Sequence, residues 1–167
     1  MGRVVITHTL DVTPKEYWRR CLLSESFNEE YFVKGLGFRA YEVVESRQEG
    51  DLHHRKIRTV PKVEPPRVIQ KAIGGEIAYI EEGVFDGNTY TFSIKPSVMS
   101  EKILINGSFT AEPVGENQMK RIATMDIRVR VFGIGKAIET FIEQSTRHNF
   151  NSGISFIREF LARPESE

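Results

Sequence analysis

Histidines are the side chains of this sequence best suited to proton transfer near neutral pH, because an imidazole ordinarily titrates near 6.5. His8 lies in an alternating apolar segment near the start of the chain, which places it on the inward face of a predicted strand. His53 and His54 are adjacent and would point to opposite faces of a strand, with Arg55 on the same face as His53. If the protein is an enzyme, these groups would serve as general acid or base, aided by a tyrosine or an arginine. The catalytic candidates are His8, His53, His148, Tyr79 and Arg55.

Each histidine also has a purely structural interpretation. On the inward face of a strand, His8 would be a hydrogen-bonded residue of a core or cavity. His53 and His54 would be solvated strand residues. The sequence therefore leaves both interpretations open.

The motifs of several catalytic and cofactor-binding classes do not occur. The chain has no Gly-x-Ser-x-Gly, no His-Glu-x-x-His and no pair of Cys or His at metal-ligand spacing. Gly133-Ile134-Gly135-Lys136 lacks the first glycine and the final Ser or Thr of a phosphate loop, so it predicts a tight strand-to-helix turn. The single Cys21 excludes an internal disulfide. We therefore predict no metal site and no cofactor.

A long amphipathic segment near the C-terminus, residues 136–162, contains no proline and predicts a helix about 39 Å long. Its apolar stripe begins with Ile134, Ile138 and Phe141, and the same register then reaches the polar Ser145 and His148. Polar groups at these positions would face a wet or ligand-filled cavity, since an unpartnered buried polar group costs about 1–3 kcal/mol. Alternatively, the stripe drifts around the helix and leaves these polar residues in solvent. It would then continue through Phe150, Ile154, Ile157 and Leu161.

The remaining segments predict an antiparallel sheet preceded by two short helices. A first strand ends near Leu10, and Thr13-Pro14-Lys15-Glu16 is a capping box with proline at the first helical position. A second capping signal begins at Ser26, and a further short helix is predicted between Pro65 and Gly75. Turn signals separate alternating segments rich in Val, Ile, Tyr, Phe and Thr. These segments lie near residues 38–47, 52–60, 76–85, 89–95, 102–112 and 119–132.

Length and charge restrict the classes of protein. The 167 residues predict one domain over residues 1–163, followed by a disordered tail, residues 164–167. The 23 basic residues balance 23 acidic residues, so the sequence does not predict a nucleic-acid partner. No apolar run approaches the ~18 residues of a membrane span, and the N-terminus lacks a signal-peptide pattern. We expect a cytoplasmic protein without integral membrane association.

The order of elements resembles the helix-grip fold of the START-like or SRPBCC superfamily, which includes the birch-pollen-allergen family and the aromatic polyketide cyclases. The local features that carry the resemblance are Thr13-Pro14-Lys15-Glu16-Tyr17-Trp18, which opens the first helix, and Val131-Phe132-Gly133-Ile134-Gly135-Lys136-Ala137-Ile138-Glu139, which joins the last strand to the last helix. The Pro65-Pro66 break looks like that of an uncharacterised bacterial branch. The resemblance implies an α+β fold with a curved seven-stranded antiparallel sheet, two short helices after strand 1 and a long C-terminal helix.

The resemblance also implies a hydrophobic cavity between the sheet and the C-terminal helix. Members of the superfamily bind lipids, sterols, polyketides or plant hormones there, and a minority catalyse cyclisation or dehydration. Inward-facing residues of the strands and the helix would line this cavity. The predicted ligand-binding residues are His8, Phe38, Ile57, Tyr79, Phe92, Ile105, Phe109, Met125, Ile127, Ile138, Phe141, Ser145 and His148.

Three functional hypotheses follow. The first is a non-catalytic protein that binds or transports a hydrophobic small molecule, such as a lipid, a sterol or a polyketide-like compound. The second is an enzyme similar to polyketide cyclases or dehydratases. The third is a protein-interaction module. A smooth apolar cavity favours the first, convergent titratable groups favour the second, and a filled core favours the third.

Overall fold

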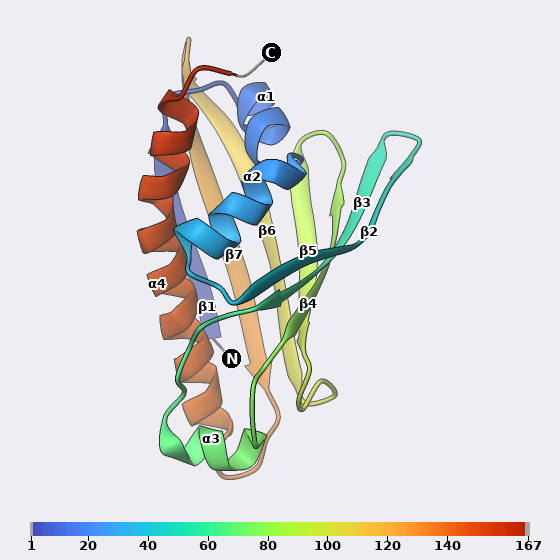
Figure 1. The fold of residues 1–167 in the computed structure, drawn as a ribbon, viewed down its shortest axis with the longest axis vertical. Coiled ribbons are helices and arrows are strands. Elements are labelled where there is room, and N and C mark those ends of the chain that lie inside the picture. Colours follow the sequence, from blue (N-terminus) through green and yellow to red (C-terminus); the bar gives the residue numbers. More distant parts are fainter. Residues whose placement is uncertain (1, 166–167) are drawn as a thin grey trace.

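The structure, a computed structural model, describes residues 2–165. Seven antiparallel strands form one sheet in the order β1-β7-β6-β5-β4-β3-β2, which curves around a long helix (Figure 1). This is the helix-grip α+β fold predicted from the sequence. The strands are β1 (Gly2–Leu10), β2 (Ala40–Glu49), β3 (Leu52–Val60), β4 (Tyr79–Phe85), β5 (Thr89–Pro96), β6 (Ile103–Gly115) and β7 (Gln118–Val129).

Two short helical segments follow β1 and cover one end of the sheet (Figure 1). Thr13 caps the first, as predicted, by accepting a hydrogen bond from the Glu16 backbone N–H at 3.2 Å. The second is capped by Ser24, not by Ser26, since the Ser24 hydroxyl accepts from the Phe27 N–H at 3.3 Å. Each of these two short α-helices continues into a π-helical turn. The segments are α1 (Pro14–Tyr17), η1 (Trp18–Leu22), α2 (Glu25–Glu30) and η2 (Tyr31–Gly35).

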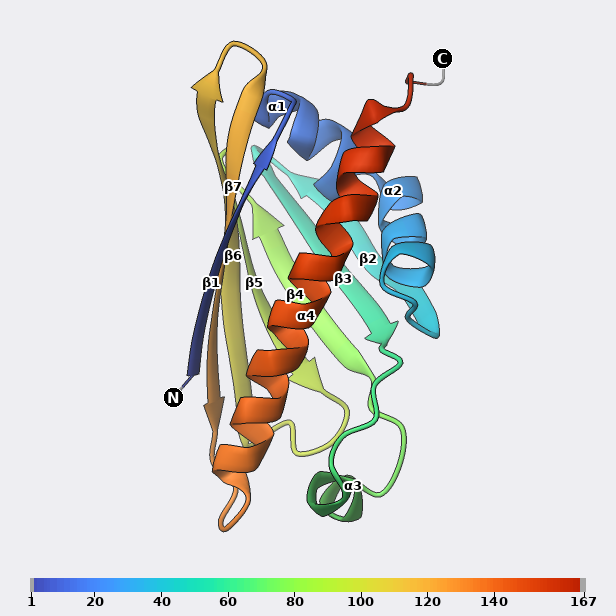
Figure 2. The same ribbon diagram turned by 90° about the vertical axis from the view of Figure 1, so that its left-hand side faces the viewer.

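The C-terminal helix α4 (Gly135–Ala162) lies diagonally across the concave face of the sheet (Figure 2). Its buried side chains include Ile138, Ile142, Ile154 and Ile157. They pack against the inward-facing residues of the strands in one hydrophobic core. The helix therefore closes the sheet on the side where any ligand site must lie.

Alternation along each strand decides which residues meet the helix. On β7, Met119, Arg121, Ala123 and Met125 are buried, while the residues between them are partly exposed. The inward set thus includes one arginine. The same alternation on β1 turns His8 toward the helix side of the sheet together with buried neighbours.

The ends of several elements differ from the sequence-based expectations. The fourth strand begins at Tyr79 rather than residue 76, and the seventh ends at Val129 rather than residue 132. The short helix α3 (Arg67–Ile73) lies inside the predicted segment and ends where Gly74 adopts φ 75°, a left-handed conformation that glycine accommodates without strain. Of the predicted tail, Glu165 forms an ion pair with Arg19 at 2.7 Å, and residues 166–167 lie outside the described residues. Between residues 2 and 165, no helix combines the length and apolar character needed to cross a membrane.

Candidate ligand-binding cavity

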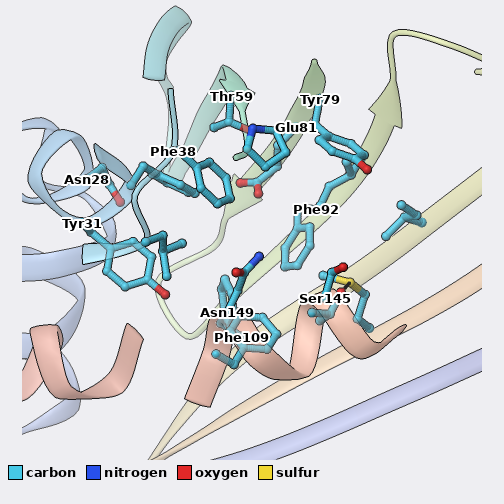
Figure 3. A pocket seen from close by; sticks show the side chains of 18 of the residues that line it. Asn28, Tyr31, Phe38, Thr59, Tyr79, Glu81, Phe92, Phe109, Ser145 and Asn149 are labelled. Carbon is cyan, nitrogen blue, oxygen red and sulfur yellow. Dashed lines mark hydrogen bonds between the residues drawn. The ribbon is translucent and has the colours of Figure 1, made fainter. Parts of the chain in front are cut away.

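A cavity of about 180 Å³ lies between α4, the concave face of the sheet and the two short helices (Figure 3). Its wall is mostly apolar and aromatic. The apolar lining residues include Phe32, Leu36, Phe38, Phe92, Ile94, Ile105, Phe109, Met125, Phe141, Ile142, Phe150 and Ile157. A wall of this kind suits an apolar molecule.

Aromatic rings on neighbouring strands form much of the wall. Phe92 and Phe109 lie with ring centroids 5.2 Å apart, and Phe150 of α4 meets the Phe109 ring edge to face at 5.8 Å. Gly107 of β6 makes room for the Phe92 ring. A Cβ at this position would lie 2.5 Å from Phe92 Cζ and 2.7 Å from the Thr124 carbonyl oxygen. Glycine is therefore required there for the rings to lie against the sheet.

Arg55 of β3 reaches the cavity as part of a closed polar cluster. Its side chain is 8% exposed and forms an ion pair with Glu81 of β4, with Nη2 3.0 Å from Oε2. Its Nε donates to the Tyr90 hydroxyl at 3.2 Å, and its Nη1 donates to the Leu22 carbonyl oxygen at 2.9 Å. Burial by itself lowers the pKa of the Arg55 guanidinium, but Tyr90 and Glu81 outweigh it and the net shift is upward. Arg55 is therefore charged and fully partnered.

Tyr90 completes this cluster. Its hydroxyl donates to Glu81 Oε2 at 2.6 Å, and its ring lies beneath the guanidinium of Arg55, with Cζ 4.8 Å from the ring centroid. Burial raises the pKa of Tyr90, and the Glu81 carboxylate raises it further, so the hydroxyl keeps its proton. The Tyr90 ring occupies the space where a Cβ would stand on Gly83. A side chain at Gly83 would consequently displace the tyrosine.

Arg121 of β7 is a second buried arginine in the cavity wall, and its surroundings differ. Only 3% of the Arg121 surface is exposed to solvent, and the residue lines the cavity. Its Nη2 lies 3.3 Å from His8 Nδ1, whereas Nε has no hydrogen-bond partner among residues 2–165. The guanidinium also lies 5.8 Å from the ring centroid of Phe109 and 5.9 Å from that of Phe150. In the described part of the chain, Arg121 forms no ion pair with a carboxylate.

The polar neighbours of Arg121 are neutral. Because arginine can only donate, His8 Nδ1 must accept, and His8 is then the neutral tautomer protonated on Nε2. Burial lowers the pKa of His8, and the charge of Arg121 lowers it further. Burial raises the pKa of Tyr17, and raises that of Tyr31 to about 12, so both phenols are protonated at neutral pH.

The helix contributes further polar groups to the cavity. Ser145, Thr146 and Asn149 line it, and Figure 3 shows Ser145 and Asn149 rising from α4 toward the strands. Thr146 donates to the Ile142 carbonyl oxygen at 2.8 Å. No hydrogen bond holds the Ser145 hydroxyl or the Asn149 amide group within residues 2–165. These two groups are available to a ligand.

Many of the predicted ligand-binding residues lie together around the cavity, although whether they bind a ligand stays a prediction. The catalytic candidate Arg55 lies with them. The predicted residues that line the cavity are Phe38, Tyr79, Phe92, Ile105, Phe109, Met125, Phe141 and Ser145. The predicted residues that do not line it are His8, Ile57, Ile127, Ile138 and His148, together with the catalytic candidate His53.

The histidines lie outside the cavity wall for three different reasons. His148 is exposed because the buried stripe of α4 drifts from Phe141 to Asn149, which leaves His148 in solvent. His53 lies near the β2–β3 turn, where its Nε2 is 3.1 Å from the Ser46 hydroxyl. His8 is on the inward face but does not line the cavity, and its Nδ1 contacts Arg121 Nη2. Ile57, Ile127 and Ile138 are fully buried and pack elsewhere in the interior.

Sequence reasoning missed several polar residues of the wall. Arg121 continues the inward alternation of Met125 and Ala123 along the same strand, so period-two spacing could have identified it. Glu81 lies two residues after Tyr79 and shares its face. The other polar residues of the wall were not predicted to line it. They are Tyr17, Asn28, Tyr31, Thr59, Thr146 and Asn149.

The sequence profile of the family described as "Protein of unknown function (DUF2505)" matches residues 6–161. The chain belongs to this family. The match runs from the middle of β1 through nearly all of α4, so the DUF2505 region includes all residues that line the cavity. No curated protein sequence matches the chain.

Solved structures share the fold of this DUF2505 member at low sequence identity. A START superfamily protein from Mycobacterium smegmatis has a TM-score of 0.66 and 11% identity, over 96% of this chain and 99% of that one. The Zhui aromatase/cyclase from Streptomyces sp. R1128 has a TM-score of 0.64 and 11% identity, over 92% of both chains. Ara h 8.0201 has a TM-score of 0.61 and 12% identity, over 97% of this chain and 99% of that one. The resemblance predicted from the sequence is thereby confirmed at the level of the fold.

The acidic and thiol side chains of the described region do not assemble a metal site. Within residues 2–165, no group of three or more His, Cys, Asp or Glu side chains is placed to hold a metal ion. Cys21 is a buried free thiol, and burial raises its pKa to about 12. The described wall offers a ligand apolar contacts, hydrogen-bonding groups and charged side chains.

Proposed function

We propose that this protein binds a hydrophobic small molecule in the cavity beneath α4 and carries it without changing it chemically. The observation that supports the proposal is a partly open cavity of about 180 Å³ whose aromatic walls belong to the hydrophobic core. A domain of this size normally fills its core at close to crystal density, and a concave apolar cavity of this kind suits a small apolar ligand. The filled core expected of a pure interaction module is not what this region contains.

The volume of the cavity limits the size of the ligand. Drug-sized ligands occupy pockets of about 300–1,000 Å³, whereas an apolar cavity of about 150 Å³ accepts a single benzene ring. At about 180 Å³, the cavity suits one ring with a short substituent, or a short acyl chain. A sterol or a fused-ring polyketide would require the walls to move apart.

The placement of titratable groups supports a carrier over an enzyme. None of the four histidines lines the cavity. Glu81, the carboxylate in the wall, already pairs with Arg55 and accepts a hydrogen bond from the Tyr90 hydroxyl. Both partners engage Glu81 Oε2, so the carboxylate already serves as the counter-charge of Arg55.

A blocking variant tests the proposal. Ser145 points into the cavity, so Ser145→Phe should fill part of it and weaken binding of single-ring probes at least tenfold. His148 lies three residues further along the same helix and is exposed, so His148→Phe adds the same ring outside the cavity. Phenylacetate, phenylacetamide and hexanoate can be titrated by calorimetry or by NMR shift mapping.

The outcomes of this test are distinct. Saturable binding to the wild type and to His148→Phe, with loss in Ser145→Phe, supports the proposal. An absence of saturable binding for every probe would contradict it, as would equal binding by the two variants. Native mass spectrometry of the protein before and after incubation with a bound probe would show whether the probe is released unchanged, as a carrier requires.

A further inference from the structure

Arg121 has an uncompensated charge in the cavity wall. Among residues 2–165 its guanidinium forms no ion pair, and its Nε has no hydrogen-bond partner. A guanidinium carries five N–H donors in a planar fork, and it cannot lose its proton near neutral pH. The buried site therefore holds a positive charge and at least one N–H donor, that of Nε, without a hydrogen-bond partner.

The neighbours of Arg121 reduce the cost of this charge but do not neutralise it. His8 accepts one hydrogen bond as a neutral imidazole, and Phe109 and Phe150 offer their ring faces. A buried charge is strongly unfavourable unless an opposite charge pairs with it. An opposite charge for Arg121 would have to come from outside the described residues.

The polar and the apolar residues of the cavity wall lie at different positions along α4. Near Arg121 lie Tyr17, Tyr31 and Phe150, while Thr146 contacts Met125 Sδ at 3.5 Å further toward the N-terminal half of the helix. Beyond Thr146 the helix presents Phe141 and Ile142 to the cavity, and the strands present Ile94 and Ile105. An occupant of this space would meet one charged end and one apolar end.

We propose that the ligand is a small amphipathic carboxylate whose carboxyl group pairs with Arg121 and whose apolar body lies among the aromatic and aliphatic residues of the wall. This inference rests on the proposed function and specifies its ligand class. The planar guanidinium fork matches a carboxylate with two parallel hydrogen bonds. The Tyr31 hydroxyl, which no described residue engages in a hydrogen bond, and the Asn149 amide offer further donors (Figure 3).

Arg55 cannot serve the same purpose. Glu81 already neutralises its charge, and each of its three nitrogens already donates to Glu81, Tyr90 or Leu22. A ligand carboxylate at Arg55 would lie against the Glu81 carboxylate and be repelled by it. The two arginines of the wall are therefore distinguishable in a binding experiment.

The experiment compares phenylacetate with its neutral analogue phenylacetamide on the wild type and on three variants. Hydrogen bonds to a charged group predict that the wild type prefers the acid about ten- to a hundredfold. Arg121→Met should bring the ratio of affinities near one while leaving phenylacetamide binding within a fewfold of wild type. Arg121→Lys keeps the charge and should retain part of the preference. Lys120→Met removes one positive charge from the opposite face of the same strand and should retain all of it.

A measurement on the wild type keeps the inference testable if a variant does not fold. The NMR signal of the Arg121 Nε–H should shift on addition of phenylacetate and remain in place with phenylacetamide. Acetate, which has no apolar body, should compete at least tenfold more weakly than phenylacetate.

Each possible result either supports or contradicts the inference that Arg121 binds a ligand carboxylate. Equal affinity of acid and amide for the wild type, or an acid preference that survives in Arg121→Met, overturns the inference while the proposed cavity function stands. Acetate binding as tightly as phenylacetate would show a simple anion site and would also overturn it. If neither ring compound binds, both the inference and the proposed function fail.

Discussion

Two buried arginines line the same cavity and differ in how their charge is balanced. Arg55 pairs with Glu81 at 3.0 Å and donates to the Tyr90 hydroxyl and a backbone carbonyl. Arg121 has only neutral polar neighbours, His8, Tyr17 and Tyr31, beside two aromatic rings, and its Nε has no partner in the described chain. The Arg55 cluster is complete without a ligand, whereas the Arg121 site is not.

This difference separates a structural role from a binding role. The buried Arg55–Glu81 ion pair, together with Tyr90, joins β3, β4, β5 and the end of η1 at Leu22. This ion pair links the elements that carry it. Removing one partner would leave the charge of the other buried and unpaired, which lowers the free energy of unfolding. A buried charge without an opposite charge lowers the stability of the empty protein and favours an anion that enters the cavity. The following variants test this distinction.

The largest effect on stability is expected for Glu81→Ala. It leaves the Arg55 guanidinium buried without its counter-charge, and breaking a buried pair in this way costs about 3–5 kcal/mol in free energy of unfolding. Urea denaturation followed by circular dichroism measures this loss. A free energy of unfolding within about 1 kcal/mol of wild type would show that the Arg55 cluster is not a structural connection.

Arg121→Met is the matched change in the other region. No carboxylate of the described chain loses its partner, and an apolar side chain of similar length replaces an unpaired charge. The free energy of unfolding of the ligand-free protein should change by less than about 1 kcal/mol or increase. A decrease in the free energy of unfolding as large as that of Glu81→Ala would mean that both arginines contribute equally to stability.

A smaller effect is expected for the tyrosines of the two regions. Tyr90→Phe removes a hydroxyl that donates to Glu81 and accepts from Arg55, so it should cost about 1–3 kcal/mol. Tyr31→Phe removes a hydroxyl that makes no hydrogen bond with another described residue, and it should be nearly neutral for stability. The same denaturation measurement applies to both. Equal costs for the two changes would contradict the distinction.

The smallest effect is a pH dependence of stability. The pKa of His8 is lowered from its ordinary 6.5, first by burial and then by Arg121, and the pKa of His53 is lowered by burial and then by Arg55. The unfolded chain then binds protons that the folded chain does not, so the free energy of unfolding decreases as the pH falls below about 6.5. Above that pH the contribution of each histidine is fully present.

Because Glu81 offsets the charge of Arg55 and nothing in the described chain offsets that of Arg121, His8 should carry more of this pH dependence than His53. We expect His8→Gln to flatten the decline in stability between pH 7 and pH 5 more than His53→Gln does. Urea midpoints at a series of pH values measure the two slopes. A larger flattening by His53→Gln would indicate that the Arg121 charge is compensated.

The helix α4 illustrates how much of the site the sequence could predict. Its start near Lys136, its end at Ala162 and the inward position of Phe141 and Ser145 all follow from a period of 3.6 residues. The same pattern allowed two continuations after Ser145, one through His148 and one that drifts around the helix. The structure adopts the drift, because the curved sheet and the short helices contact the helix along a line that is not parallel to its axis.

The polar residues of the wall were harder to predict for a physical reason. Arg55 and Arg121 both lie at inward positions of their strands, and period-two spacing identifies such positions. Spacing along one strand contains no information about which carboxylate on another strand comes within reach. Glu81 meets Arg55 through the register of β3 and β4, in which Arg55 stands opposite Gly83.

By itself, the sequence predicted the order of elements and the apolar character of the interior, because these depend on periodicity, caps and turns that act over a few residues. The class of fold followed from the resemblance of that order to the helix-grip fold. The tertiary structure alone decided that the core contains a cavity of about 180 Å³ and that the histidines lie outside its wall. It also decided that Glu81 neutralises Arg55, whereas no carboxylate among residues 2–165 neutralises Arg121. Charge balance in a protein interior depends on distances between side chains from separate strands and helices, and those distances exist only after the sheet has curved around its helix.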